Sequence, residues 1–253
     1  MGFLWLGLAT ASAGALSDTL NTVSPYLEQH SPFGAPAFEP SDVEKMSRGE
    51  TVWKDSKKRT GETLLTIGGL IEASPAAVWI AILDDDHNGL SDRVLDRELT
   101  PRREGYKSLY QHISLPYPLS DRHWIIEIQT DRDLYQVSQK RIWRRGWDLD
   151  PRGEAALGAL SPADQSQIRS GVWTPANEGE WLVIPAGEHC VVIYRGRFDV
   201  GGKIPESIAQ AVGNQGALDL FNQLQELANQ MPSHYQTGHP PILAPTGQSL
   251  PPW

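Results

Sequence analysis

The sequence predicts an α+β fold in which a curved antiparallel sheet wraps around a long C-terminal α-helix. Three observations predict it: β-prone segments recur between residues 50 and 199, a short helix stands early among them, and a regular amphipathic helix comes last. The apolar stripe of the last helix needs an apolar surface to lie on, and the inward faces of the strands offer one. A sheet of this kind often leaves a cavity beside its helix, and such cavities hold apolar small molecules.

The clearest strand is predicted at residues 122–130. There Glu127 and Gln129 alternate with the apolar Trp124, Ile126 and Ile128, which is the period of a strand with one wet face and one inward face. Six further strands are predicted at residues 62–71, 91–99, 105–115, 134–145, 180–184 and 188–199.

Helix starts are marked by Ser-Pro pairs. Ser74 caps and Pro75 opens a short helix to about Asp84, and residues 161–162 mark a second start. The last helix is predicted from Pro205 to about Gln230. Its apolar stripe consists of Ile208, Val212, Ala217, Leu220, Phe221, Leu224 and Leu227.

The two ends differ from the middle. Residues 1–18 hold a short apolar run followed by the Ala-Ser-Ala of residues 11–13, as in a secretory signal peptide, yet no Lys or Arg precedes the run. They are therefore either a signal peptide, which implies an extracytoplasmic protein (periplasmic or secreted), or an apolar arm packed on a cytoplasmic one. Residues 19–44 are expected to be a linker or strap, residues 45–231 the folded domain, and residues 232–253 an extended or disordered Pro-rich tail.

Composition excludes several classes of function. The net charge of −9 argues against nucleic-acid binding, which depends on Lys and Arg neutralising phosphates. The one cysteine excludes an internal disulfide framework and zinc sites built on two or more thiolates. His189 and Cys190 are neighbours on a predicted strand and point to opposite faces, so they cannot form a nucleophile and base pair.

Three stretches carry a resemblance to a known family. They are residues 69–79 (GLIEASPAAVW), residues 115–122 (LPYPLSDR), and Tyr194 followed by residues 199–205 (DVGGKIP). In their order and spacing they are similar to START-type lipid-transfer domains and their bacterial relatives in the polyketide-cyclase-like, helix-grip (SRPBCC) superfamily. The resemblance covers about residues 45 to 230. It implies a helix-grip fold and non-covalent binding of a lipid-like ligand, with no cofactor, in a monomer.

The resemblance also implies a set of residues that line a ligand cavity. If the sheet packs directly against the helix, the same residues would instead form an ordinary hydrophobic core. The set is Trp79, Tyr110, His112, Trp124, Ile126, Ile128, Val192, Tyr194, Val212, Leu220, Phe221 and Leu224. Tyr110, His112, Arg122 and Tyr194 could orient a ligand head group. Strand phase leaves open whether Tyr110 or its neighbours Leu109 and Gln111 point inward. Asp121 and Arg122 are alternatively a pair that fixes the turn.

Two other motifs suggest other partners. Residues 84–92, from Asp84 to Asp92, follow the spacing of a calcium loop, but Leu95 stands where the bidentate Glu is needed. The basic run Arg141, Arg144 and Arg145 is either a peripheral contact with anionic lipid heads or a solvated strand edge.

The leading hypothesis is therefore a non-catalytic binding or transport protein for a hydrophobic small molecule. One alternative is an enzyme of the cyclase or aromatase type that acts in the same cavity. The second alternative is a calcium-stabilised interaction protein that uses the loop from Asp84 to Asp92.

Overall fold

The computed structural model describes residues 12–57, 63–84, 94–99, 106–115, 117, 119–168, 171–199, 201, 206–238 and 242–250. The side chains at residues 94–96, 167–168, 206–214 and 217 lie outside this description.

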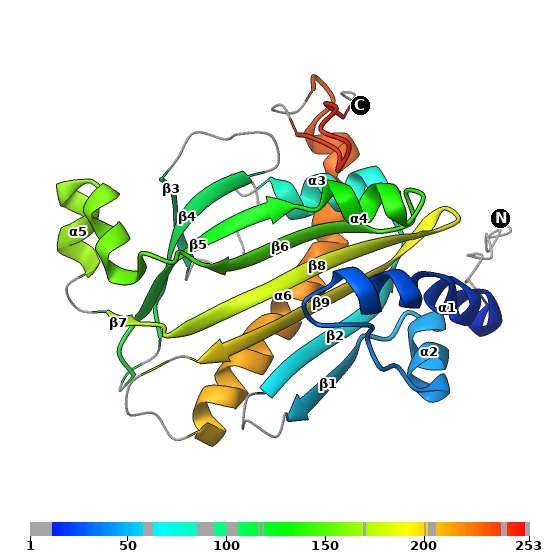
Figure 1. The fold of residues 1–253 in the computed structure, drawn as a ribbon, viewed down its shortest axis with the longest axis horizontal. Helices are drawn as coiled ribbons and strands as arrows, with labels where there is room; N and C mark the ends of the chain where they lie inside the picture. Colours follow the sequence, from blue (N-terminus) through cyan, green and yellow to red (C-terminus); the bar gives the residue numbers. More distant parts are fainter. Residues whose placement is uncertain are drawn as a thin grey trace, which may run out of the picture.

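A curved nine-stranded sheet forms the body of the molecule, in the order β1-β2-β9-β8-β6-β5-β4-β3, with β7 beside β5 (Figure 1). The strands are β1 (Val52–Lys57), β2 (Thr63–Ile71), β3 (Val94–Glu98), β4 (Tyr106–Ile113), β5 (Arg122–Thr130), β6 (Trp143–Leu149), β7 (Val172–Trp173), β8 (Ala176–Ala186) and β9 (His189–Asp199). All neighbours pair antiparallel except β7, which runs parallel to β5. The predicted α+β class is confirmed, and β5 has the predicted bounds.

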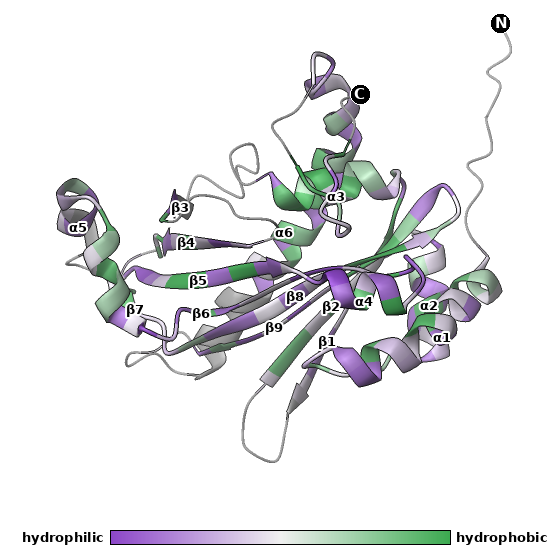
Figure 2. Ribbon diagram, turned by 45° about the horizontal axis from the view of Figure 1, so that its top comes forward, coloured by the Kyte–Doolittle hydropathy of each residue, from purple (hydrophilic) through white to green (hydrophobic). Residues whose placement is uncertain are grey.

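Helices cover both faces of the sheet. They are α1 (Ala13–His30), α2 (Pro40–Ser47), α3 (Pro75–Leu83), α4 (Arg132–Val137), the 3-10 helix η1 (Gly153–Ala159), α5 (Pro162–Ile168) and α6 (Glu206–His234). The long α6 crosses one face, which we call the inner face, and α3 packs against α6 there. Helices α1 and α2 lie on the opposite, outer face, as the turned view in Figure 2 also shows.

Each face has its own core because alternate residues of a strand point to opposite sides. On β5, Trp124, Ile126 and Ile128 join the inner core, together with Trp79 of α3. Ile125, between them, packs with residues of η1 on the outer side. The sheet is therefore apolar on both faces, and the inner core is the one that α6 shares.

Residues 134–145 were predicted to form one strand, and the structure corrects this. They contain most of α4 and only the start of β6 at Trp143. The side chain of Asp131 caps α4 by accepting a hydrogen bond from the backbone N–H of Leu134 at 2.8 Å. The chain then turns through positive φ at Gln139 and Lys140, so no continuous strand can form.

The N-terminal residues expected to be a linker or strap contain two helices. Ser12 caps α1, accepting a hydrogen bond from the N–H of Ala15 at 3.2 Å. Leu16, Val23 and Leu27 of α1 are buried in the outer core. This spacing matches a helical stripe, which stabilises α1 although Pro25 lies within it.

Part of the Pro-rich tail, expected to be extended or disordered, folds back on the inner core. Residues 242–250 turn on themselves, with the N–H of Leu250 bonded to the carbonyl of Ile242 at 2.9 Å. Ile242 is buried, and Leu250 packs beside it. The indole N–H of Trp79 donates to the carbonyl of Leu243 at 3.0 Å, which fastens this segment to α3.

Candidate functional site

Five aromatic rings form a continuous cluster on the inner face, which we call the inner aromatic cluster: Trp147 of β6, Trp181 of β8, Tyr194 and Phe198 of β9, and Phe221 of α6. Tyr194 lies at its centre, with ring centroids 5.5 Å from Trp147, 4.6 Å from Trp181 and 6.3 Å from Phe198. Trp181 extends the cluster to Phe221 at 6.3 Å. The cluster thus joins the end of β9 to the helix.

Glycines make room for two of these rings. A Cβ at Gly179 would lie 2.2 Å from Cζ2 of Trp147, and one at Gly69 would lie 2.9 Å from Cε1 of Phe221. Only glycine allows rings to lie so close to the strands. The indole N–H of Trp147 donates to Oδ1 of Asn177 at 2.9 Å, which holds that ring in place.

Both faces of the sheet are closed to solvent to a similar extent. Trp147 and Trp181 of the inner core keep 8% of their surface accessible, as does Leu70 of the outer core, and residues of both cores, such as Val192 and Ile193, keep 0%.

Among the described residues, the hydroxyl of Tyr194 and the indole N–H of Trp181 donate to no protein oxygen, and neither is one of the fully buried polar atoms that lack a partner. The two residues are direct partners across β8 and β9. Burial raises the pKa of the Tyr194 hydroxyl, so that it stays protonated and can donate.

Charged groups also lie on the inner face. Lys107 of β4, Arg145 of β6 and Asp84 are all buried, and Arg145 is the cross-strand partner of Trp181. Burial, together with nearby Arg145, lowers the pKa of Lys107 to about 6, and Asp84 opposes the shift. The guanidinium of Arg145 donates to the carbonyl of Ile82 and so ties the end of α3 to the sheet.

Most of the predicted lining residues do meet in one place. The inner core contains Trp79, Trp124, Ile126, Ile128, Val192, Tyr194, Phe221 and Leu224, and Leu220 packs against it partly buried. The side chain of Val212 lies outside the described residues.

Tyr110 and His112 lie on the outer face and not in the interior where they were expected. Tyr110 is fully buried beneath η1, beside Ile125. His112 bonds through Nε2 to Oδ2 of Asp121 at 2.9 Å. The inward residues of β4 are the neighbours, Leu109 and Gln111, and Gln111 accepts from the indole N–H of Trp124 at 2.8 Å. The period of a strand fixes which residues share a face but not which face is inner.

Asp121 and Arg122 organise the turn between β4 and β5. Oδ1 of Asp121 accepts from the backbone N–H of Leu115 at 3.2 Å. Arg122 donates to the backbone carbonyl of Ser120 and, at 3.3 Å, to that of Gly201 beyond β9. The guanidinium thereby joins the turn before β5 to the loop after β9.

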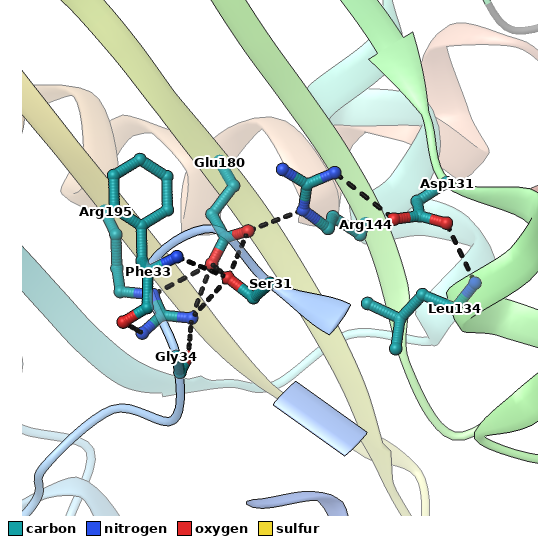
Figure 3. Close-up of polar contacts among 8 residues, drawn as sticks. All are labelled: Ser31, Phe33, Gly34, Asp131, Leu134, Arg144, Glu180 and Arg195. Atoms are coloured by element: carbon teal, nitrogen blue, oxygen red, sulfur yellow. Dashed lines mark hydrogen bonds and ion pairs between the residues drawn. The ribbon is translucent and has the colours of Figure 1, made fainter. Parts of the chain in front are cut away.

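Arg144 and Arg145 of the basic run lie neither on a solvated strand edge nor at a surface for lipid heads, because β6 is an interior strand and both are buried; Arg141 precedes β6 and is exposed. Figure 3 shows the partners of Arg144 on the outer face. Its Nε lies 2.5 Å from Glu180, whose other oxygen is 2.5 Å from Nη2 of Arg195. Ser31 donates to the same carboxylate at 2.9 Å, so this network fastens the end of α1 to the sheet.

The predicted calcium loop lies outside the described residues except for Asp84, which is buried. Within the described part of the chain, no group of three or more His, Cys, Asp or Glu side chains is arranged to hold a metal ion. Over the same residues, no helix has the length and apolar character needed to cross a membrane.

The sequence reasoning missed Trp147 and Trp181, the two largest side chains of the inner aromatic cluster. A signal was present in the sequence, because Trp147 stands at an alternate position after Trp143, and Trp181 alternates with Val183 within the predicted strand at residues 180–184. The mistaken strand at residues 134–145 hid it by ending before Trp147.

Cys190 is buried, burial raises the pKa of its thiol to about 12, and its Sγ contacts the carbonyl of Ala73.

No family model matches the sequence, and no curated protein matches it significantly. Solved structures do match. Human StAR-related lipid transfer protein 5 aligns with a TM-score of 0.57 at 12% identity, over 87% of this chain and 99% of that one. Human STARD10 aligns with a TM-score of 0.53 at 14% identity, over 73% of this chain and 76% of that one. A STAR-related lipid transfer protein from Xanthomonas axonopodis (fragment 25–204) aligns with a TM-score of 0.52 at 16% identity, over 70% of this chain and 99% of that one. The chain has a START-type fold.

Proposed function

We propose that this protein binds a hydrophobic small molecule without covalent chemistry, between the inner face of the sheet and α6, and acts as its carrier. The observation that carries the proposal is the apolar and aromatic inner face, where Trp147, Trp181 and Tyr194 lie with Phe221 of α6 in one core. Sites for small hydrophobic ligands are lined mainly by apolar and aromatic side chains.

The fold supports the same function. Two of the similar structures are named as lipid transfer proteins, and a third, human StarD13, as a lipid transfer and protein localization domain. Fold alone does not determine function, so the chemistry of the inner face has to agree with it. It does, since the inner core is mainly apolar and aromatic.

Native mass spectrometry of freshly purified protein tests the proposal. We expect a bound species that organic extraction releases, and a fluorescent fatty-acid or sterol probe that binds the extracted protein. Protein that carries nothing and binds neither probe would refute the function.

A matched pair of variants locates the ligand. Ile126 and Ile125 are neighbours on β5 that point to the inner and the outer face. Ile126→Val and Ile125→Val each remove one methylene group, at a similar cost in stability of about 1 kcal/mol. We expect Ile126→Val to weaken probe binding up to about fourfold, from one lost methylene contact, and Ile125→Val to leave it unchanged. Equal effects would place the ligand elsewhere.

A second candidate, an enzyme of the cyclase or aromatase type, is favoured by Lys107. With its pKa lowered to about 6, this amine is mostly neutral at pH 7 and could accept a proton from a bound substrate. Prolonged incubation of the extracted ligand with fresh protein distinguishes the two functions. A carrier returns the ligand with its mass and chromatographic behaviour unchanged, whereas an enzyme returns a product, and Lys107→Met then abolishes its formation.

A further inference from the structure

Both faces of the sheet are closed to solvent, so a ligand can reach the inner face only if an element that covers it moves. Trp79 of α3 and Val192 of β9, both in the inner core, keep 0% of their surface accessible. Neighbouring strands are joined along their length, as β8 is to β9 from Ala176 to Ala186, and separating them would break many backbone hydrogen bonds at once. The segment that opens is therefore one that lies on the sheet, not a strand of it.

The segment at residues 242–250 can move as one unit. Its backbone groups bond within the segment, the N–H of Leu250 to the carbonyl of Ile242 at 2.9 Å and the N–H of Ala244 to the carbonyl of Gln248 at 2.8 Å. These bonds stay intact when the segment lifts. Lifting therefore leaves none of these buried or half-buried backbone groups without its partner.

The attachment of this segment to the rest of the described chain is small. The indole N–H of Trp79 donates to the carbonyl of Leu243 at 3.0 Å, and the described residues make no other hydrogen bond between the segment and the domain. Of its nine residues, only Ile242 and Pro245 are buried. Segments with few buried apolar contacts and much exposed surface open more readily than the core of a fold.

The segment covers the place where the two inner helices meet. It lies beside α3 at the C-terminal end of α6 (Figure 1). Met231 near the end of α6, Tyr235 after it and Ile242 of the segment all belong to the inner core. Trp79 of α3 is fully buried, and its ring centroid lies 5.7 Å from that of Trp143 at the start of β6. Lifting the segment would open the interior at α3 and α6 without breaking any strand pair.

We infer that residues 242–250 form a plug over the α3 end of the inner core, and that the hydrophobic ligand enters and leaves the protein there when the plug lifts. The inference rests on the proposed function and adds the route by which the ligand exchanges. Ile242 holds the plug closed, together with the hydrogen bond from Trp79 to Leu243.

Hydrogen exchange of the indole N–H groups tests the lifting on the full-length protein after lipid extraction. Trp79 and Trp147 both donate to protein oxygens, and Trp79 is the more buried, with 0% exposure against 8%. Burial alone predicts slower exchange at Trp79, whereas a lifting plug predicts exchange about tenfold faster than at Trp147. Nuclear magnetic resonance measures both, and Trp79→Phe and Trp147→Phe assign the two signals. Exchange at Trp79 that is equal to that of Trp147 or slower would overturn the plug.

A matched pair of full-length variants tests the route. Ile242→Ala and Ile125→Ala each truncate a buried isoleucine, in the plug and on the outer face respectively. Each protein is loaded with a fluorescent fatty-acid probe, and stopped-flow mixing with excess unlabelled fatty acid measures the dissociation rate. We expect Ile242→Ala to release the probe about tenfold faster than wild type, because the lost contacts stabilise only the closed plug. Ile125→Ala should release it at the wild-type rate.

Circular dichroism shows whether each variant is folded before loading. If one is not, Ile242→Val and Ile125→Val take their place, with an expected increase of about threefold for Ile242→Val and none for Ile125→Val.

The outcomes separate the two proposals. A probe that binds neither wild type nor the variants would overturn the proposed function, whatever the indole exchange shows. A probe that binds wild type and leaves the two variants at the same rate would leave that function standing and overturn the route. Faster release from the Ile242 variant alone, with faster exchange at Trp79, supports both.

Discussion

Glu180 is the residue on which the outer face depends most. It is fully buried and contacts Arg144, Arg195 and Ser31. We expect Glu180→Gln to lower the free energy of unfolding by about 3 kcal/mol, because it removes the carboxylate that pairs with the buried Arg195 and leaves Arg144 only its 3.3 Å pair with Asp131. Glu178→Gln is the control. Glu178 and Arg197 form a partly exposed ion pair, so the free energy of unfolding should fall by less than about 1 kcal/mol. Urea unfolding measures both, and equal losses would contradict this role of Glu180.

Lys107 should make stability depend on pH. In the folded protein its pKa is lowered to about 6 from its ordinary value of 10.5. Between these values the unfolded chain holds one more proton than the folded protein, so the contribution of Lys107 to the free energy of unfolding rises with pH, by at most about 1.4 kcal/mol per pH unit. We expect the difference in unfolding free energy, wild type minus Lys107→Met, to increase from pH 6 to pH 9. Parallel pH curves for the two proteins would show that Lys107 does not titrate in this range.

The spacing of residues in the sequence predicted which side chains share a face of the sheet, but not which of the two faces is the inner one. The alternation in residues 122–130 placed Trp124, Ile126 and Ile128 on one face correctly. The same spacing could not place Tyr110, because a shift of one residue moves a side chain to the other face, and local sequence does not say which face a helix will cover.

At the scale of elements, the segment at residues 242–250 closes the α3 end of the inner core. Its Ile242 is buried, and its Leu243 carbonyl accepts from Trp79. We expect a chain that ends at residue 238 to expose Trp79, shifting its fluorescence to longer wavelength and increasing its quenching by acrylamide, relative to a full chain with Trp253→Phe, because truncation also removes Trp253. Trp79→Phe in the full chain removes the hydrogen bond and also leaves a cavity in the core, so it should cost more than the bond alone, which contributes about 1 kcal/mol. An unchanged emission spectrum after truncation would show that the segment does not cover Trp79.

Elements were predictable where their own sequence determines them. The strand at residues 122–130 and the Ser-Pro start of α3 appear as expected. The tail and α1 were not predictable, because their conformation depends on surfaces formed by distant residues. Leu27 is buried against the outer face, and Ile242 against α3 and α6. Proline in both segments suggested irregular chain, but tertiary packing outweighed this local preference.

For the whole molecule, the proposed function predicts that the ligand stabilises the fold. A ligand that binds only the folded protein adds about 2.7 kcal/mol at a free concentration one hundred times its Kd. Protein as purified should therefore unfold at higher urea than the same protein after lipid extraction, with the same dependence on urea concentration. Identical midpoints would show that extraction removes nothing that the fold binds.

The pairing of β2 with β9 has a consequence for how the chain folds. It joins Leu64 to Arg197 and Ile71 to Cys190, so an early strand can only be completed by one of the last. During synthesis, the edge of β2 that pairs with β9 stays unpaired until most of the chain has left the ribosome. Contacts so distant in sequence slow folding, and open strand edges promote aggregation. Newly made chains should therefore rely on chaperones until β9 has been synthesised. The pairing of β9 with β2 then also places Tyr194 in the sheet.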